Sequence, residues 1–219
     1  PLELSKAEVP ESATVANLFK KGRATNTLLF WLAFFMCLLT MYALGSWMPK
    51  LMMAAGYSMG SSLLFLLAMN IGAVIGTVSG GMLADRFHLK PVIMVLGVVG
   101  AIVLSLLGFE PPQVALYLMI ALAGAASIGS QILLYSYVAQ YYPVAVRSTG
   151  IGWASAVGRS GAIIGPILIG MLLGMDLPHQ YNFIAVGIPL LVVAIAVILI
   201  SKQDQAEEVE VKTAAVARN

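Results

Sequence analysis

The sequence is poor in charge. Only 10% of its 219 residues are Asp, Glu, Lys or Arg, whereas 60% are hydrophobic. Soluble domains carry about 25% charged residues, because water must solvate their surface. A chain of this composition cannot cover a water-exposed surface. It is therefore predicted to be an integral membrane protein whose surroundings are mostly lipid.

Several site chemistries are also absent from the sequence. A single cysteine, Cys37, excludes a disulfide framework within the chain. The two histidines, His88 and His179, lie far apart without metal-ligand spacing, and no motif for a nucleophile, a zinc protease or a phosphate-binding loop occurs. No basic stripe is interleaved with aromatic residues. We therefore expect no enzyme activity, no metal, no cofactor and no nucleic-acid partner.

Six long uncharged runs dominate the chain. A bilayer core of about 30 Å needs roughly 20 apolar residues in a helix. Runs of that length cover residues 27–48, 61–83, 91–109, 113–139, 149–174 and 181–200, with one internal charge, Arg159. The sequence therefore predicts an all-α integral membrane protein, with six transmembrane helices bundled within residues 26–201. Glycines four residues apart are typical of close helix packing in lipid; they occur at Gly72, Gly76 and Gly80, and at Gly161 and Gly165.

The charges outside these runs predict the orientation. The cations on one side of the membrane include Lys20, Lys21, Arg23, Arg86, Lys90, Arg147 and Lys202. Lys50 is the sole cation on the other side. Because positive charge concentrates in cytoplasmic loops, both ends of this multi-pass protein are expected in the cytoplasm.

The two ends of the chain are polar. Residues 1–25 are interpreted as a cytoplasmic linker, in which Val15, Leu18 and Phe19 form either a short helix on the membrane surface or part of a solvated loop. Residues 202–219 are interpreted as a disordered cytoplasmic tail. The first residue is not Met, no signal peptide is present, and six spans are half of a common transporter size. We therefore expect the chain to begin in the middle of a larger protein.

Arg159 is the strongest candidate for a functional residue. It lies about ten residues into the fifth run, roughly 15 Å deep at 1.5 Å per residue. A charge at the bilayer centre costs about 2.5–3.5 kcal/mol, and no Asp or Glu lies inside any of the six runs. An anionic ligand is the natural partner, because a guanidinium binds a carboxylate through two parallel hydrogen bonds. The alternative is a structural arginine that bonds backbone carbonyls.

Other polar side chains inside the runs are candidates for the same site. Gln131 and Tyr135 are four residues apart and share one helix face, and Ser155 precedes the arginine by one turn. We expect Gln131, Tyr135, Asn70 and Tyr42 to line a cavity that binds a partly aromatic, partly polar substrate. Alternatively, these side chains form hydrogen bonds between helices, worth about 1 kcal/mol each.

The loop from Gly81 to Lys90 holds a second charged cluster. Asp85 and Arg86 lie together at the end of the second run. The carboxylate can cap a neighbouring helix or pair with Arg147, and such a pair would close the cytoplasmic side in one conformational state. The alternative is that these charges only set the membrane topology.

Three segments resemble a known family. The loop from Gly81 to Lys90 resembles the G-x-x-x-D-R-x-x-x-[RK] loop of the major facilitator superfamily, in the copy between helices eight and nine, with His88 where glycine is usual. Residues 142–166 resemble the helix-eleven region of the aromatic acid/proton symporter family, and residues 42–49 resemble the end of its helix seven. The resemblance covers about residues 18–200 and implies that the six spans are helices seven to twelve of a twelve-helix transporter.

This resemblance implies a proton-coupled symporter that imports a benzoate-like or hydroxybenzoate-like anion across the bacterial inner membrane by alternating access. It implies that Asp85, Arg147 and Arg159 occupy positions important for transport, and that the proton-linked aspartates lie in helix one, outside this sequence. The partners would be the aromatic carboxylate, the lipid bilayer and the N-terminal six-helix half, with a proton as the coupling ion. Two alternatives stay open: a membrane sensor or structural subunit, and a major facilitator transporter for another organic anion or a sugar.

Overall fold

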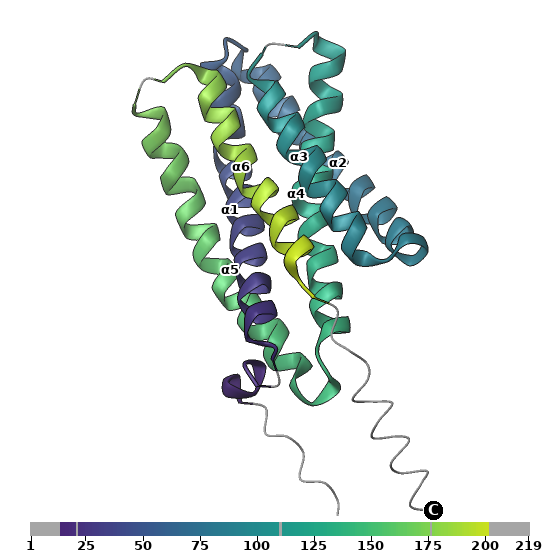
Figure 1. Cartoon of the computed structure of the whole chain (residues 1–219). Helices are drawn as coiled ribbons and strands as arrows, with labels where there is room; N and C mark the ends of the chain where they lie inside the picture. The colour runs from purple at the N-terminus through teal and green to yellow at the C-terminus, as the bar shows by residue number, and fades with distance from the viewer. Residues whose placement is uncertain (1–13, 21, 110, 176, 202–219) are drawn as a thin grey trace, which may run out of the picture.

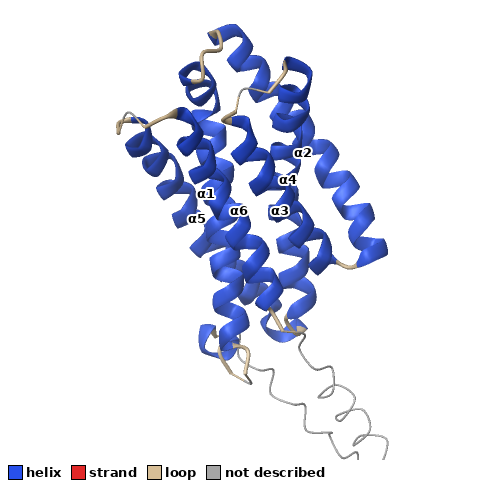
Figure 2. Cartoon of the chain, turned by 45° about the horizontal axis from the view of Figure 1, so that its top comes forward, coloured by secondary structure: helices blue, strands red, loops and turns tan. Residues whose placement is uncertain are grey.

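The computed structural model describes residues 14–20, 22–109, 111–175 and 177–201. Within these residues the chain forms one short 3-10 helix and six helices that are long and apolar enough to cross a membrane, with no strand. The elements are η1 (Val15–Leu18), α1 (Ala24–Ala54), α2 (Met59–Phe87), α3 (Leu89–Leu107), α4 (Gln113–Tyr141), α5 (Val144–Leu173) and α6 (His179–Leu199). The predicted all-α, six-helix membrane fold is confirmed. Figure 2 shows loops only at the two ends of the bundle.

Most helices extend beyond the uncharged runs from which they were predicted. The first run was expected to end before Pro49 and Lys50, but α1 continues through both to Ala54. The second run was expected to end before Asp85, and α2 continues to Phe87. Helices do not stop where the lipid ends, because backbone hydrogen bonds continue into the interface and polar side chains are tolerated there.

The first residue of α1 and the last residue of α6 lie at the same end of the bundle, which we call the terminal end (Figure 1). The helices alternate in direction between this end and the opposite end. Helix α1 packs mainly on α5 and α6, α2 packs on α4, and α3 packs on α6 and α4. Figure 1 shows α5 along one edge of the bundle and α2 along the other. Both edge helices therefore leave a broad apolar face uncovered.

Glycines bring the packed pairs into backbone contact. A Cβ atom at Gly72 would overlap the carbonyl of Ala121 in α4, and a Cβ atom at Gly76 would overlap Ala125. On the other side of the bundle, a Cβ atom at Gly165 would overlap the carbonyl of Leu39 in α1. Because lipid provides little hydrophobic drive between helices, such close approach supplies much of the packing energy.

Polar side chains tie the helices together at the terminal end. The ammonium of Lys90 donates hydrogen bonds to the carbonyls of Ile198 and Ile200, over 2.9 and 2.7 Å. The side-chain amide of Asn26 pairs with the backbone of Ser201 through two hydrogen bonds of 3.2 Å each. Asn26 also donates to the hydroxyl of Tyr141 over 2.7 Å. The last turn of α6 is therefore attached to α1 and α3.

The expectation for residues 15–19 needs correction. Leu18 is completely buried against the bundle, and its carbonyl accepts a hydrogen bond of 2.8 Å from the hydroxyl of Thr27. The ring of Phe19 packs edge-on against Trp31, with centroids 5.5 Å apart. Leu18 thus packs on the protein, because α5 lies beside the segment, whereas Phe19 stays 36% exposed. Residues 1–13 and the expected tail, 202–219, lie outside the described residues.

Candidate functional site

Arg159 lies near the middle of α5 on its exposed face. It makes no hydrogen bond or ion pair with any residue that the structure describes. The one acidic residue among the described positions is Asp85, at the end of α2. The guanidinium is therefore not satisfied by backbone carbonyls of this bundle, which was the structural alternative.

A hydrogen bond between α4 and α5 fixes the surroundings of Arg159. The hydroxyl oxygens of Tyr135 and Ser155 lie 3.0 Å apart. Gln131 lies one turn from Tyr135 along α4, and Arg159 lies one turn from Ser155 along α5. The two helices are antiparallel. The step from Tyr135 back to Gln131 and the step from Ser155 forward to Arg159 therefore both lead away from the terminal end. Gln131 and Arg159 therefore lie at the same level along the bundle axis, one turn beyond the contact between Tyr135 and Ser155.

Gln131 is buried inside the bundle, with 5% of its surface exposed. Neither the nitrogen nor the oxygen of its carboxamide has a hydrogen-bond partner among the described residues. An unsatisfied buried polar atom costs about 1–3 kcal/mol, so such groups are rare without a reason. Tyr135 is half-buried, and its ring packs edge-on against Phe34, with centroids 4.8 Å apart.

The remaining predicted substrate residues, Asn70 and Tyr42, make no described hydrogen bond with this group. Asn70 is exposed on α2, and its side chain donates a hydrogen bond of 2.8 Å to the carbonyl of Leu66 in its own helix. Tyr42 is 46% exposed on α1, and its hydroxyl makes no hydrogen bond with the described residues. The structure thus places Gln131 and Arg159 each one turn from the contact between Tyr135 and Ser155, while Asn70 and Tyr42 lie on separate helices.

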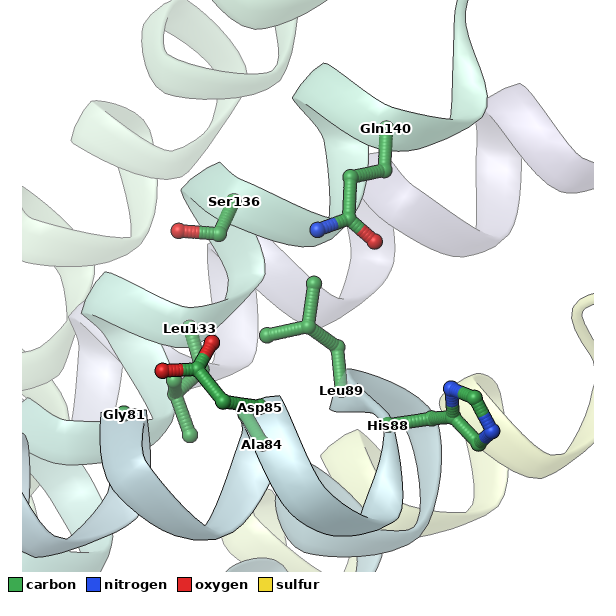
Figure 3. Close-up of a pocket in the computed structure, with 8 residues that line it drawn as sticks. All are labelled: Gly81, Ala84, Asp85, His88, Leu89, Leu133, Ser136 and Gln140. Carbon is green, nitrogen blue, oxygen red and sulfur yellow. The ribbon is translucent and has the colours of Figure 1, made fainter.

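The charged loop between α2 and α3 opens into a polar recess of about 330 Å³. Its lining residues are Gly81, Ala84, Asp85, His88, Leu89, Leu133, Ser136 and Gln140. Figure 3 shows the carboxylate of Asp85 and the side chains of Ser136 and Gln140 facing the same space, whereas the His88 ring points away. The recess lies between α2 and α4 at the terminal end and offers acceptors and donors to a polar group.

The anticipated ion pair between Asp85 and Arg147 is not formed in this structure. The Nε atom of Arg147 donates to the carbonyl of Tyr142, over 3.4 Å. Asp85 instead faces the recess beside α4. The guanidinium of Arg86 lies 5.5 Å from the ring of Phe87, and the side chain is exposed. In this structure the two side chains therefore have different surroundings.

His88 joins α2 to α3 in an unusual backbone conformation, with φ at 68° and ψ at 156°. This region of backbone space is populated almost exclusively by glycine and costs other residues about 1–3 kcal/mol. His88 stands at the position where the family loop usually has glycine. The structure shows why glycine suits it: the chain must turn there in a conformation that a Cβ atom opposes.

Comparison with known proteins agrees with this fold. The model of the Major Facilitator Superfamily matches residues 30–217. The chain is 52% identical to the benzoate transport protein of Acinetobacter baylyi over 189 residues, which cover 86% of this chain and 41% of that protein. It is 44% identical to the gentisate transporter of Corynebacterium glutamicum, covering 76% of this chain and 38% of that protein.

A third relative is the 4-hydroxybenzoate transporter of Pseudomonas aeruginosa, at 32% identity over 87% of this chain and 44% of that protein. The six long apolar helices define an integral membrane protein. The chain belongs to the Major Facilitator Superfamily. It spans about two fifths of the length of the curated relatives named above.

Proposed function

We propose that this chain forms the second six-helix half of a twelve-helix transporter, which imports an aromatic carboxylate of the benzoate or hydroxybenzoate class together with a proton. The supporting observation is Arg159, a cation in mid-helix without a counter-charge among the described residues. The named relatives support the substrate class, because all three are transporters of aromatic acids by name.

The environment of Arg159 decides between a lipid-facing and a cavity-facing arginine. A cation at the centre of a helix in lipid costs about 2.5–3.5 kcal/mol. That cost is avoided if the exposed face of α5 meets the other half of the transporter across a polar cavity. Transporters of this kind bind substrate near the midplane, where their two halves meet. A carboxylate in that cavity would receive both parallel hydrogen bonds of the guanidinium.

The neighbours of Arg159 match such a ligand. Gln131 offers an unsatisfied carboxamide at the same depth, and Tyr135 offers an aromatic face one turn away. Tyr42 and Asn70 would contribute from α1 and α2 as the halves close. The substrate is thus held by one charge and by several neutral polar and aromatic groups.

Charged residues at the terminal end would shift the equilibrium between the inward-facing and outward-facing states. The proposal assigns Asp85, Arg86 and Arg147 to this role, with Asp85 free to bind a group from the other half in one state. It places both ends of the chain in the cytoplasm and the protein in the bacterial inner membrane. The coupling proton would be carried by the other half, because the structure describes no acid near Arg159.

Uptake by the full-length protein tests the proposal. Cells that express it should accumulate labelled benzoate or 4-hydroxybenzoate, faster with an acidic exterior and not after an ionophore collapses the proton gradient. Arg159→Ala should abolish uptake while its amount in the membrane stays unchanged. The matched control is Lys20→Ala, which removes an exposed cation at the terminal end and should transport normally.

Counterflow in vesicles separates a transporter from a membrane sensor. A transporter preloaded with unlabelled substrate exchanges it for labelled substrate, whereas a sensor binds without exchange. Normal uptake by Arg159→Ala, or binding without counterflow in the wild type, would overturn the proposal.

A further inference from the structure

The hydrogen bond between Tyr135 and Ser155 leaves one proton unused. Each hydroxyl carries a single proton, and the pair shares one hydrogen bond of 3.0 Å. One hydroxyl therefore donates to the other, and the accepting hydroxyl keeps its own proton. No other acceptor among the described residues receives it. A half-buried O–H group without an acceptor, beside the site of a cation, is a donor available to a ligand.

Four other serines of the bundle behave differently. The hydroxyls of Ser79, Ser105, Ser127 and Ser160 each donate to a carbonyl three or four residues earlier in their own helix, over 2.6–2.9 Å. This back-bonding is the usual way for a serine inside a helix to satisfy its hydroxyl. Ser155 instead reaches across to another helix. Its hydroxyl is thus held in a direction that its own helix does not require.

The chemistry of the two hydroxyls indicates which one donates. A phenol is the more acidic hydroxyl and the better donor, which favours Tyr135 as the donor and Ser155 as the acceptor. A hydroxyl that accepts a hydrogen bond becomes a stronger donor itself, because the bonds polarise one another. The remaining proton then belongs to Ser155, which lies one turn from Arg159 on the same face of α5.

We propose that Ser155 is a further substrate-binding residue, whose hydroxyl, oriented by Tyr135, donates a hydrogen bond to the carboxylate that Arg159 holds. Tyr135 is then a positioning residue that acts through Ser155. This inference rests on the proposed function, because it needs a carboxylate at Arg159. It adds a neutral donor to the charged one and fixes the carboxylate from two directions, which a single guanidinium does not do.

Uptake kinetics of labelled benzoate by the full-length protein test this inference. Ser155→Ala should raise KM about tenfold and leave Vmax within about twofold, because a hydrogen bond to a charged group is lost. Ser155→Thr keeps a hydroxyl and should restore KM to within about threefold. Tyr135→Phe should raise KM about threefold, since Ser155 keeps its proton but loses its orientation. The matched control is Ser127→Ala. The Ser127 hydroxyl bonds a carbonyl of its own helix, so this variant should leave KM unchanged.

The outcomes separate the two hypotheses. If the wild type takes up neither benzoate nor 4-hydroxybenzoate, the proposed function fails and this inference fails with it. If the wild type transports and Ser155→Ala keeps the wild-type KM, or if Ser155→Thr is as impaired as Ser155→Ala, this inference alone is overturned. Should Ser155→Ala not reach the membrane, Ser155→Cys replaces it, because a thiol keeps the volume and is a weak donor.

Discussion

Gly161 of α5 lies directly against the backbone carbonyl of Phe35 in α1. Gly158 packs in the same way against Phe34 and Leu38. These two glycines flank Arg159 in sequence, so the contact between α1 and α5 determines how far the arginine stands from the bundle. Packing and function are therefore linked at this contact: the small residues that fix the position of α5 also fix the direction of the arginine in the middle of that helix.

Enlarging Gly161 should separate the two helices. In Gly161→Ala, the new Cβ atom would overlap the Phe35 carbonyl, and overpacking of this kind costs about 1–3 kcal/mol. The apparent unfolding temperature of the purified full-length protein in detergent should fall. Gly152→Ala is the matched control, because a Cβ atom there meets nothing within 4 Å, and alanine favours the helix by about 1 kcal/mol. Equal unfolding temperatures for the two variants would contradict the packing argument.

His88→Gly should stabilise the protein. The backbone at His88 has a positive φ of 68°, and relief of the strain is worth about 1–3 kcal/mol. The greater freedom of glycine in the unfolded chain offsets about 0.5–1 kcal/mol of this. The unfolding temperature of the full-length protein should therefore rise modestly. His88→Ala removes the same imidazole and keeps the Cβ atom, so a similar rise in that variant would show that strain is not the cause.

Tyr142 should make stability depend on alkaline pH. This residue follows the last turn of α4, where burial raises the pKa of its phenol to about 12, while the hydrogen bond to Thr27 lowers it. The ordinary pKa of tyrosine is about 10. Because the folded pKa is the higher one, its contribution to stability is complete below about pH 10 and is lost as pH rises through 12.

Tyr142→Phe tests this dependence. Near neutral pH the variant should unfold at a lower temperature than the wild type, because one hydrogen bond worth about 1 kcal/mol is missing. That deficit should shrink between pH 10 and pH 12, since the variant has no phenol to ionise. Thr27→Val is the control: it loses this hydrogen bond, together with those from Thr27 to the carbonyls of Leu18 and Arg23. Because it retains the phenol, its stability should continue to fall with pH. A deficit of Tyr142→Phe that stays constant over this range would refute the assignment.

Much of the fold follows from the lengths of the apolar runs. In lipid a backbone must satisfy its own hydrogen bonds, so each uncharged run of about 20 residues has one structure available to it. Helix spacing also places Gln131 with Tyr135 and Ser155 with Arg159 on common faces. What spacing does not contain is the angle between helices, and therefore the contact between Tyr135 and Ser155 needed the three-dimensional structure.

Two contacts at the terminal end could not be predicted from the sequence, for a related reason. Proximity along the membrane surface suggested that Asp85 could pair with Arg147, but Arg147 donates to the carbonyl of Tyr142. The pattern around Leu18 suggested a helix on the lipid surface or a loop in water, but in the structure neighbouring helices bury the Leu18 side chain. In both cases a protein partner replaced the expected one, and which helices are neighbours at the terminal end is decided by tertiary packing.

Arg159→Lys is the most demanding test of the carboxylate site. Lysine keeps the charge, so a site that needs only a positive potential would continue to work. A guanidinium, however, presents a rigid fork that bonds both carboxylate oxygens at once, and an ammonium acts as a point charge. We expect Arg159→Lys to reach the membrane at the wild-type level and to abolish uptake of labelled benzoate, as Arg159→Ala does. If lysine supports uptake with an unchanged KM, the arginine acts through charge alone, and the two-oxygen geometry assigned to this site is wrong.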